Sequence, residues 1–459
     1  MKKIISILKN KEIMGRIVFT LAILLIFRIG SAITVPGVTV NDVNFAEDSV
    51  FGLMNLLGGG ALSTFSIFAL GVSPYITSSI IVELLSMDVL PALAELNKQG
   101  QTGRKKKEMT TRYLTLLLGA VQGYGIIKTM ENSSYITLTP LSGGQVQFMD
   151  YVYIVTILVA GGMLVMWLGD QITSKGLGNG ISVIIFAGIV SSLPNQFVTA
   201  FQQWLYYPLM SQVSSNILEG AIRFAMYVVA YLLIICFVVF IELSKRKIPV
   251  QHSGKSGSSK MSSASFLPLK INSAGVIPVI FASSILMAPT VIVSFISGAD
   301  TSAEWLKVFS INEFTTMPWF NDQTWRMPWG LIIYLILIFV FSYFYSNLQI
   351  NPEQMSINFY NNGSYIPGIR PGNHPGNETE RYVRKVLNRI TFIGASALAL
   401  IAALPVVLTL TGVLPQQLAL GGTGLIIVVG VAIEINNQID GLLAGKSFEE
   451  VVSSGKRGY

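Results

Sequence analysis

The chain alternates long apolar runs with short polar segments. Runs close to the ~20 residues that cross a bilayer core lie at 17–35, 70–90, 113–130, 151–170, 180–197, 219–243, 274–297, 329–349, 390–411 and 418–436. Because ten spans divide into five and five, and five is odd, a structural repeat would be inverted in the second half. The pattern predicts an all-α polytopic membrane protein with ten transmembrane helices in two inverted five-helix halves.

The order of the spans also predicts the domain boundaries. The N-terminal half covers 1–197, an external connection covers 198–218, the C-terminal half covers 219–436, and a tail follows at 437–459. The halves share no convincing sequence identity, so the repeat is predicted from the number of spans alone.

Basic residues predict the orientation, because short loops rich in lysine and arginine stay in the cytoplasm. With the N-terminus inside, the predicted cytoplasmic segments hold 26 basic residues, whereas the outside segments hold only Lys307 and Arg326. Both termini are therefore predicted to be cytoplasmic, as are the long loops 244–273 and 350–389.

One apolar stretch, "NLLGGGALSTFSIFALGVSP" at 55–74, is interrupted by glycines and a proline and is too short between them to cross a bilayer. Backbone at membrane depth must be covered by protein or face a water-filled cavity. Residues 61–69 carry apolar side chains at helical spacing, and the flanking glycines permit a hinge. We predict a short re-entrant helix lodged in a cavity; the alternative is a second span that is only kinked.

Composition excludes a soluble enzyme and offers no catalytic chemistry. The 459 residues are 51% hydrophobic and 12% charged, with a mean hydropathy of +0.59, which is typical of polytopic membrane proteins. Cys236 stands alone, and His252 and His374 lie in different loops. The stretch "DGLLAGKS" at 440–447 spaces its glycines one residue too closely for a phosphate-binding loop. We expect no metal, cofactor or enzymatic activity.

Four stretches carry a family resemblance: "GGGALSTFSIFALGVSPYITSSIIVELL", "MWLGDQITSKGLGNGISVIIFAGIVSSLP", "LPLKINSAGVIPVIFASSI" and "YIPGIRPG". They resemble signature sequences of the SecY family, the central subunits of the bacterial protein-translocation channel, and the match runs from about residue 16 to 440. The resemblance implies a channel of the bacterial plasma membrane. Such a channel translocates unfolded preproteins bearing a signal sequence and releases transmembrane segments laterally into lipid.

The resemblance also implies the parts that close the channel. Segment 58–68 matches the family's plug, a short helix that seals the closed pore, with Gly60, Leu62, Phe65 and Phe68 as its residues. A ring of aliphatic pore residues is implied at Val72, Ile76, Ile181, Ile185, Ile280 and Ile427. A hydrophobic constriction resists wetting and yields to a moving chain without binding a particular sequence. Taken singly and without its motif, each ring residue is better explained as an ordinary core or lipid-facing residue; six together at motif positions favour the ring.

A lateral gate is implied between the second and seventh spans, with the third alongside. Its polar positions match Thr77, Gln122 and Ser284. Hydrogen bonds among such groups, worth about 1 kcal/mol each in membranes, would close a seam that an apolar signal helix can open. Gln122 has a second explanation, which is that it satisfies the backbone of a neighbouring helix.

Two basic loops are implied to dock a SecA-type motor ATPase and the ribosome. The residues expected to carry this docking are Lys245, Arg246, Gly368, Arg370 and Pro371. The generic alternative for the basic clusters at 103–107 and 245–247 is that they set topology or contact anionic lipids. The stretch 248–268 departs from the family because it is rich in serine and glycine, so docking contacts there are open.

The resemblance further implies small SecE-like and SecG-like membrane subunits. A rival function from another class is a secondary transporter of small solutes, which also has broken helices. Such transporters need ionisable residues deep in the membrane, and here the deepest expected charges are Arg28 and Arg223, neither of which is a carboxylate. A membrane scaffold without a conduit would leave the interrupted stretch unexplained.

Overall fold

The computed structural model describes most of the chain. The described residues are 10–41, 58–86, 99–132, 134–140, 147–206, 214–252, 265–294, 304–311, 327–370, 376–412 and 422–455, with isolated positions between these ranges.

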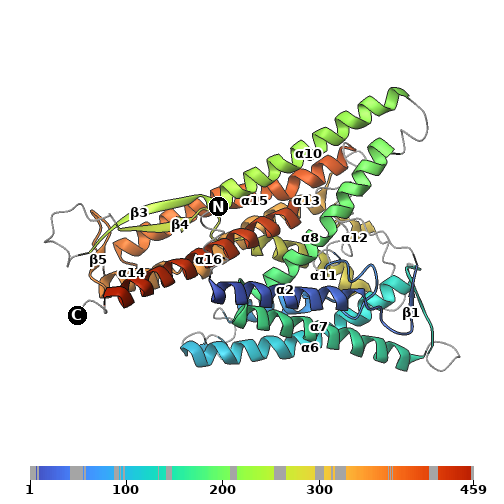
Figure 1. Cartoon of the computed structure of the whole chain (residues 1–459), viewed down its shortest axis with the longest axis horizontal. Helices are drawn as coiled ribbons and strands as arrows, with labels where there is room; N and C mark the ends of the chain where they lie inside the picture. Colours follow the sequence, from blue (N-terminus) through green and yellow to red (C-terminus); the bar gives the residue numbers. More distant parts are fainter. Residues whose placement is uncertain are drawn as a thin grey trace.

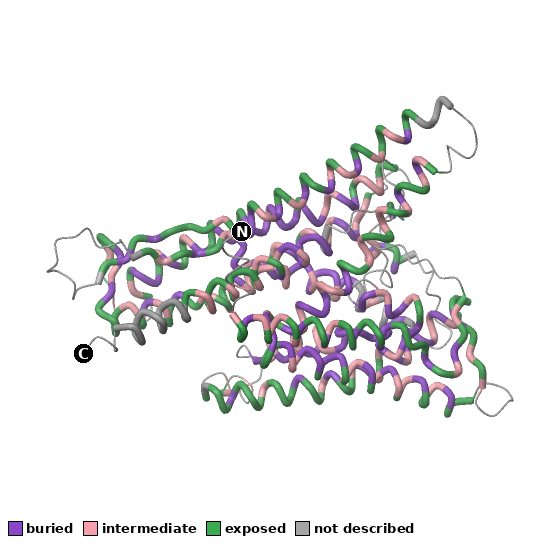
Figure 2. The backbone as a smooth tube through the Cα atoms, viewed as in Figure 1, coloured by how far each residue is buried: buried purple, intermediate pink, exposed green. Residues whose placement is uncertain are grey.

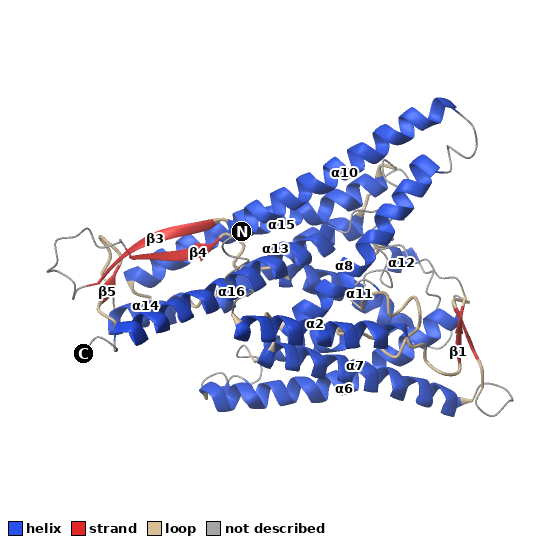
Figure 3. Ribbon diagram, in the orientation of Figure 1, coloured by secondary structure: helices blue, strands red, loops and turns tan. Residues whose placement is uncertain are grey.

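Ten helices of 13 residues or more make up the described part of the fold (Figures 1 and 3). They are α2 (Lys11–Ala32), α4 (Ser73–Leu85), α6 (Gly100–Asn132), α7 (Phe148–Lys175), α8 (Gly180–Phe201), α10 (Ser214–Leu243), α11 (Ile277–Ser294), α13 (Trp329–Gln349), α15 (Glu378–Leu410) and α16 (Gly422–Gly455). Each overlaps one predicted span, so the prediction of an all-α polytopic membrane protein is confirmed. Seven described helices are long and apolar enough by themselves to cross a membrane.

Helices α6 and α15 are two of the helices that are much longer than the bilayer is thick. Helices α6 and α15 each have 33 residues, which is about 50 Å at 1.5 Å per residue, against ~30 Å of hydrocarbon. The extra length of α6 is the basic segment that begins at Gly100, and α15 begins at Glu378 behind its N-cap Asn377. Both helices therefore continue the membrane core into polar surroundings.

The helices form two groups that meet along two seams. Figure 1 shows α2, α6 and α7 in one group and α10, α13, α15 and α16 in the other, with α8 and α11 between them. Helix α8 contacts α7 on one side and α16 on the other, whereas α11 contacts α13 as well as α4 and α6. Buried residues line the inside of both groups and exposed ones cover the outside (Figure 2). Many exposed residues are large and apolar, as expected for surfaces that face lipid.

Two small sheets lie at opposite ends of the molecule (Figure 3). Strand β1 (Val38–Val40) pairs with β2 (Ile136–Leu138) at one end. At the other end β3 (Lys245–His252), β4 (Ser265–Lys270) and β5 (Ser364–Tyr365) form a sheet in the order β4-β3-β5, beside α14 (Pro352–Asn361). The segment predicted as a plain loop at 244–273 thus contains two paired antiparallel strands, β3 and β4, which lie at the end of the molecule predicted to be cytoplasmic.

The helical prediction for 58–68 is wrong. Residues 58–65 and 67–72 are turns, and Ser66 forms an isolated bridge with Thr34. The amide of Ile67 donates to the Ile33 carbonyl at 3.0 Å, and the amide of Val35 donates to the Phe65 carbonyl at 3.0 Å. Because these backbone groups pair with the chain that follows α2, they are not available to an intrahelical ladder. The segment is nevertheless buried, as predicted.

Candidate functional site

The six predicted ring residues lie in one apolar cluster. They come from four helices, and each stands at the N-cap or within the first two turns of its helix: Val72 and Ile76 for α4, Ile181 and Ile185 for α8, Ile280 for α11, and Ile427 for α16. Val72, Ile185 and Ile427 are buried, and the other three are partly buried. The structure therefore brings together four segments that are far apart in the sequence.

Phe68 of segment 58–68, the predicted plug, packs into the same cluster. Its ring stacks on Phe27 of α2 with centroids 5.8 Å apart and planes 5° from parallel. Gly30 provides the room, since a Cβ atom there would lie 2.1 Å from Cε2 of Phe68. Gly161 of α7 provides room for the backbone of segment 58–68, because a Cβ there would lie 1.8 Å from the carbonyl oxygen of Ile67.

Leu62 and Phe65 belong to a different cluster. They are fully buried, with side chains from the ends of α6 and α7 nearest β2, among them Met130 and Ile154. Gly60 precedes them with φ +85°, a backbone conformation that favours glycine. Segment 58–68 thus connects the ring cluster to a second apolar layer on the side predicted to be external.

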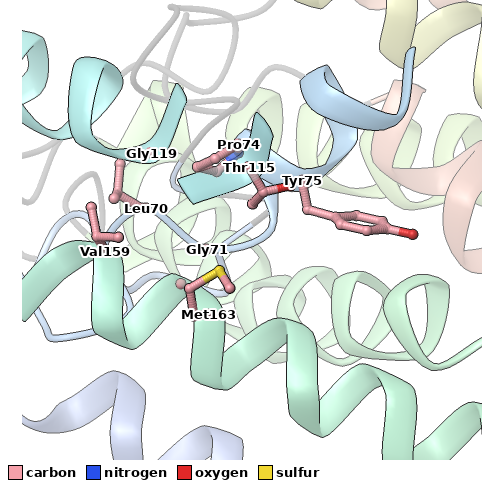
Figure 4. Close-up of a pocket in the computed structure, with 9 residues that line it drawn as sticks. Leu70, Gly71, Pro74, Tyr75, Thr115, Gly119, Val159 and Met163 are labelled. Atoms are coloured by element: carbon pink, nitrogen blue, oxygen red, sulfur yellow. The ribbon is translucent and has the colours of Figure 1, made fainter. Parts of the chain in front are cut away.

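A small cavity lies beside the start of α4, between α4, α6 and α7 (Figure 4). Its lining includes Leu70, Gly71, Gly119 and Val159, and its volume is about 10 Å³, which is room for about one water molecule. Figure 4 shows the Tyr75 ring pointing away from Leu70 and Val159. This part of the molecule is tightly packed.

The predicted hydrogen-bonded seam at the lateral gate is absent among the described residues. The hydroxyl of Thr77 donates to the Ser73 carbonyl at 3.1 Å, and that of Ser284 to the Ile280 carbonyl at 2.8 Å. Both hydroxyls satisfy the preceding turn of their own helix. Apolar packing takes the place of the expected bonds, because Ile80 of α4 shares a cluster with Val279 and Leu286 of α11.

Gln122 lies on α6, which contacts α11. Its side-chain oxygen is buried and has no hydrogen-bond partner in the described part of the chain. This oxygen therefore accepts no bond from a neighbouring backbone amide among the described residues.

Two ion pairs that sequence reasoning missed tie α4, α6 and α7 together. Lys107 Nζ of α6 lies 3.3 Å from Glu83 Oε1 of α4, and Arg112 Nη2 of α6 lies 2.7 Å from Asp170 Oδ2 of α7. Lys107 is the last residue of the basic cluster at 103–107. The charge pattern gave no signal for the pairing, because the partners are separated by 24 and 58 positions in the sequence.

The predicted docking residues form two groups. Lys245 and Arg246 are exposed at the start of β3, whereas Gln251 near its other end pairs with Tyr365 of β5. Arg246 and Gln251 are about 17 Å apart at 3.3–3.4 Å per residue. The β4-β3-β5 sheet therefore joins the two loops, and Ile366 and Ile369, just before Arg370, share an apolar cluster with Ile248 of β3.

Arg370 follows a tight turn that comes directly after β5. The amide of Ile369 donates to the Ile366 carbonyl at 2.9 Å, with exposed Gly368 between them at φ +82°. The Thr379 hydroxyl donates to the Arg370 carbonyl at 3.2 Å and ties this turn to α15. The Arg370 side chain is exposed, and Pro371 lies outside the described residues.

These features define a class of protein: a polytopic α-helical membrane protein whose two groups of helices meet at a buried aliphatic cluster. The sequence profile of the SecY family matches residues 66–436. The chain belongs to the SecY family.

Individual proteins agree with this assignment. The protein translocase subunit SecY of Bacillus subtilis (strain 168) is 41% identical over 452 residues, which cover 97% of this chain and 98% of that protein. A solved structure reported for the plug domain of the SecY protein matches with a TM-score of 0.63 and 16% identity, over 94% of this chain and 92% of that one. Sec61 in the canine ribosome–channel complex from the endoplasmic reticulum matches with a TM-score of 0.58 and 15% identity, over 94% and 93%. The two structural matches establish a shared fold.

Proposed function

We propose that this chain is the protein-conducting subunit of a translocase in the bacterial plasma membrane, with both termini in the cytoplasm. It moves unfolded preproteins bearing a signal sequence across the membrane and releases transmembrane segments sideways into lipid. The observation that carries the proposal is the single apolar cluster in which six aliphatic residues from four helices meet the packed plug segment. The 41% identical relative is named a protein translocase subunit.

The ring works by excluding water. Aliphatic side chains offer no hydrogen-bond partner to water or ions, so a narrow passage between them stays dry. A passing polypeptide displaces these side chains without forming bonds that depend on its sequence. Segment 58–68 is the plug in the closed state, even though it is built from turns, since Phe68 packs into the ring cluster from one side.

The two seams have different roles. Helix α8 continues through η1 (Gln202–Tyr206) towards α10 and also contacts α16, so this side is the hinge between halves 1–197 and 219–436, joined by 198–218. The seam of α11 with α4 and α6 is the lateral gate. Its apolar contacts exchange readily for those of an apolar signal helix, because in lipid such contacts have no strong hydrophobic driving force.

The chain acts as a passive conduit rather than as an enzyme, and partners supply the driving force. A SecA-type motor ATPase or the ribosome docks on the loop that presents Gly368, Arg370 and Pro371, and SecE-like and SecG-like subunits hold the two halves. Support for the ribosome comes from the structural match to Sec61 in a ribosome–channel complex. Lys245 and Arg246, at the membrane-proximal end of β3, face anionic lipid or the rim of the docked partner.

The rival function, a secondary transporter of small solutes, is not favoured. The profile match to SecY covers residues 66–436, most of the chain. The basic residues expected deepest in the membrane do not suggest a proton relay either. Arg223, for example, forms an ion pair at 2.5 Å with Glu219 on its own helix.

Reconstitution into liposomes tests the proposal. Vesicles that hold the chain with its small subunits should import a precursor with an intact signal only when a SecA-type motor and ATP are present. Vesicles without the chain are the control. Solute uptake without the motor, together with no precursor import, would replace the channel by the transporter.

A further inference from the structure

Arg28 is a charged residue on a membrane helix for which neither the ring nor the docking loops give a reason. On α2 it stands between buried Phe27 and Gly30, and its neighbours Leu25, Ile26 and Ile29 are exposed apolar residues on a surface suited to lipid. A guanidinium at such a position is costly and marks a functional contact by default.

The contact is with the plug segment. Nη1 of Arg28 donates to the Gly59 carbonyl at 2.8 Å. Gly59 has φ +69°, and a Cβ there would lie 3.0 Å from Cα of Gly188 and 3.3 Å from the Phe27 ring. The first residues of the segment are thus wedged between α2 and α8, and Arg28 holds the exposed side of that wedge.

The later residues of the segment are tied down in another way. The Thr64 hydroxyl donates to the Ser31 carbonyl at 3.1 Å, and backbone bonds join the chain around Phe65 to residues 33–35. Those bonds are between neutral groups. A hydrogen bond from a charged donor is roughly twice as strong as a neutral one, so the Arg28 bond is the strongest single tie in this set.

The other two basic residues within predicted spans are satisfied elsewhere. Arg223 pairs with Glu219, and Lys128 pairs with Glu131 and with the Tyr151 hydroxyl. Both pairings join residues of one helix or of neighbouring helices, and neither reaches segment 58–68. Arg28 differs from them because its acceptor is a backbone carbonyl of a segment that must move.

We propose that Arg28 is a positioning residue that acts as a clasp, holding segment 58–68 in place through its bond to the Gly59 carbonyl. The strength of this bond sets how often the closed channel leaks and how closely a signal sequence must match the channel's requirements to open it. The proposal rests on the proposed function of this segment as a seal. Opening begins when the bond between the guanidinium and the Gly59 carbonyl breaks. The first residues of segment 58–68 then leave their position between α2 and α8.

Ion conductance of the chain with its small subunits in planar bilayers, without precursor, tests the clasp. Arg28→Met keeps the length of the side chain but removes the donor, and we expect it to raise the leak about tenfold, the ratio that corresponds to ~1.4 kcal/mol. Arg28→Lys keeps a charged donor and should restore most of the seal. Arg223→Met is the matched control and should leave the leak unchanged. A second readout is import of a precursor with a weakened signal, which Arg28→Met should increase.

The deletion of 58–68 separates the possible results. In that background Arg28→Met should add no further leak, because the clasp has nothing to hold. If Arg28→Met raises the leak of the deletion variant as much as it raises the leak of the full-length chain, Arg28 acts elsewhere. If Arg28→Met has a normal leak while the deletion variant is leaky, the clasp is overturned but the role of the segment as a seal stands. A deletion that does not leak would remove both proposals. Arg28→Gln replaces Arg28→Met if the latter does not accumulate in the membrane.

Discussion

Single glycines decide how closely the plug segment approaches the helices around it. Gly30 faces the Phe68 ring and Gly161 faces the Ile67 carbonyl, each at a distance that no side chain would allow. Phe68 has little room to move, since it is buried and stacked on Phe27. The seal therefore depends on residues that have no side chain as much as on those that fill the ring.

Gly30→Ala tests this close approach. The added methyl group would overlap the Phe68 ring, and overpacking of this kind costs about 1–3 kcal/mol. We expect a larger resting ion leak and a lower unfolding temperature in detergent. Gly15→Ala on the same helix is the control, because no atom lies within 4 Å of a Cβ there. Equal behaviour of the two variants would mean that the ring of Phe68 moves aside freely.

The ring makes a second prediction at this scale. Replacing Ile76 and Ile280 together by serine should raise the leak, because hydroxyl groups stabilise water in the constriction, while precursor import continues. Conductance in planar bilayers, with segment 58–68 deleted in both channels, measures the effect of the ring alone. Ile285→Ser is the control, since Ile285 of α11 is 40% exposed and is not a member of the ring cluster. An unchanged conductance would place the constriction elsewhere.

Polar side chains at the gate show the limit of prediction at the residue scale. Motif positions were enough to place Thr77 and Ser284 on α4 and α11, the two helices of the seam. They were not enough to choose a hydrogen-bond acceptor, because a hydroxyl in a helix reaches its own preceding turn as easily as a neighbouring helix. That choice depends on the rotamer and on helix spacing, which the sequence does not display.

At the scale of elements, the membrane helices were predictable and the plug was not. A run of apolar residues long enough for a bilayer has few alternatives to a helix, because every backbone group must be satisfied within the run. In segment 58–68 the backbone groups of Phe65 and Ile67 are satisfied instead by residues 33–35, some thirty positions earlier in the chain. Apolar spacing alone cannot reveal a backbone partner of that kind.

The paired strands β3 and β4, at the end predicted to be cytoplasmic, have a partial signal in the sequence that the loop prediction did not use. Ile248 and Val250 are buried on β3, and exposed Lys247 and Pro249 alternate with them, which is the period of a strand with one covered face. The pairing of β3 with β5 was not visible, because only two residues of each strand take part. This pairing attaches the turn that presents Arg370 to the hairpin.

Arg370 carries the prediction for this element. A fixed turn loses little freedom on docking, and a planar guanidinium makes paired hydrogen bonds that an ammonium cannot. Arg370→Glu should sharply reduce ATP-dependent import into vesicles that carry equal amounts of each variant, and Arg370→Lys should also be impaired. Arg381→Glu on the exposed face of α15 is the control. Full import with Arg370→Glu would remove this residue from the docking surface.

For the whole molecule, the two seams differ in what holds them. At the proposed hinge, α8 is followed by η1, which contacts α10, and α8 packs on both α7 and α16. At the proposed lateral gate, α11 meets α4 and α6 through apolar side chains, and among the described residues the Thr77 and Ser284 hydroxyls bond within their own helices. A seam without interhelical hydrogen bonds between these polar positions leaves no unsatisfied donor or acceptor when it parts, so opening there carries a smaller penalty.

The path of a signal sequence tests this asymmetry directly. A photoreactive amino acid is placed at Thr77 or Ser284 on the gate, or at Val229 or Leu232 on α10, where both residues are more than half exposed. Translocation of a precursor is then arrested and the vesicles are irradiated. Because the signal helix replaces the apolar contacts between α4 and α11, the two gate positions should crosslink to it strongly and the two α10 positions weakly. Precursor lacking its signal should give no gate crosslink. Equal crosslinking at all four positions would mean that the signal reaches lipid without passing the seam, and strong crosslinking at α10 alone would move the gate to the side assigned to the hinge.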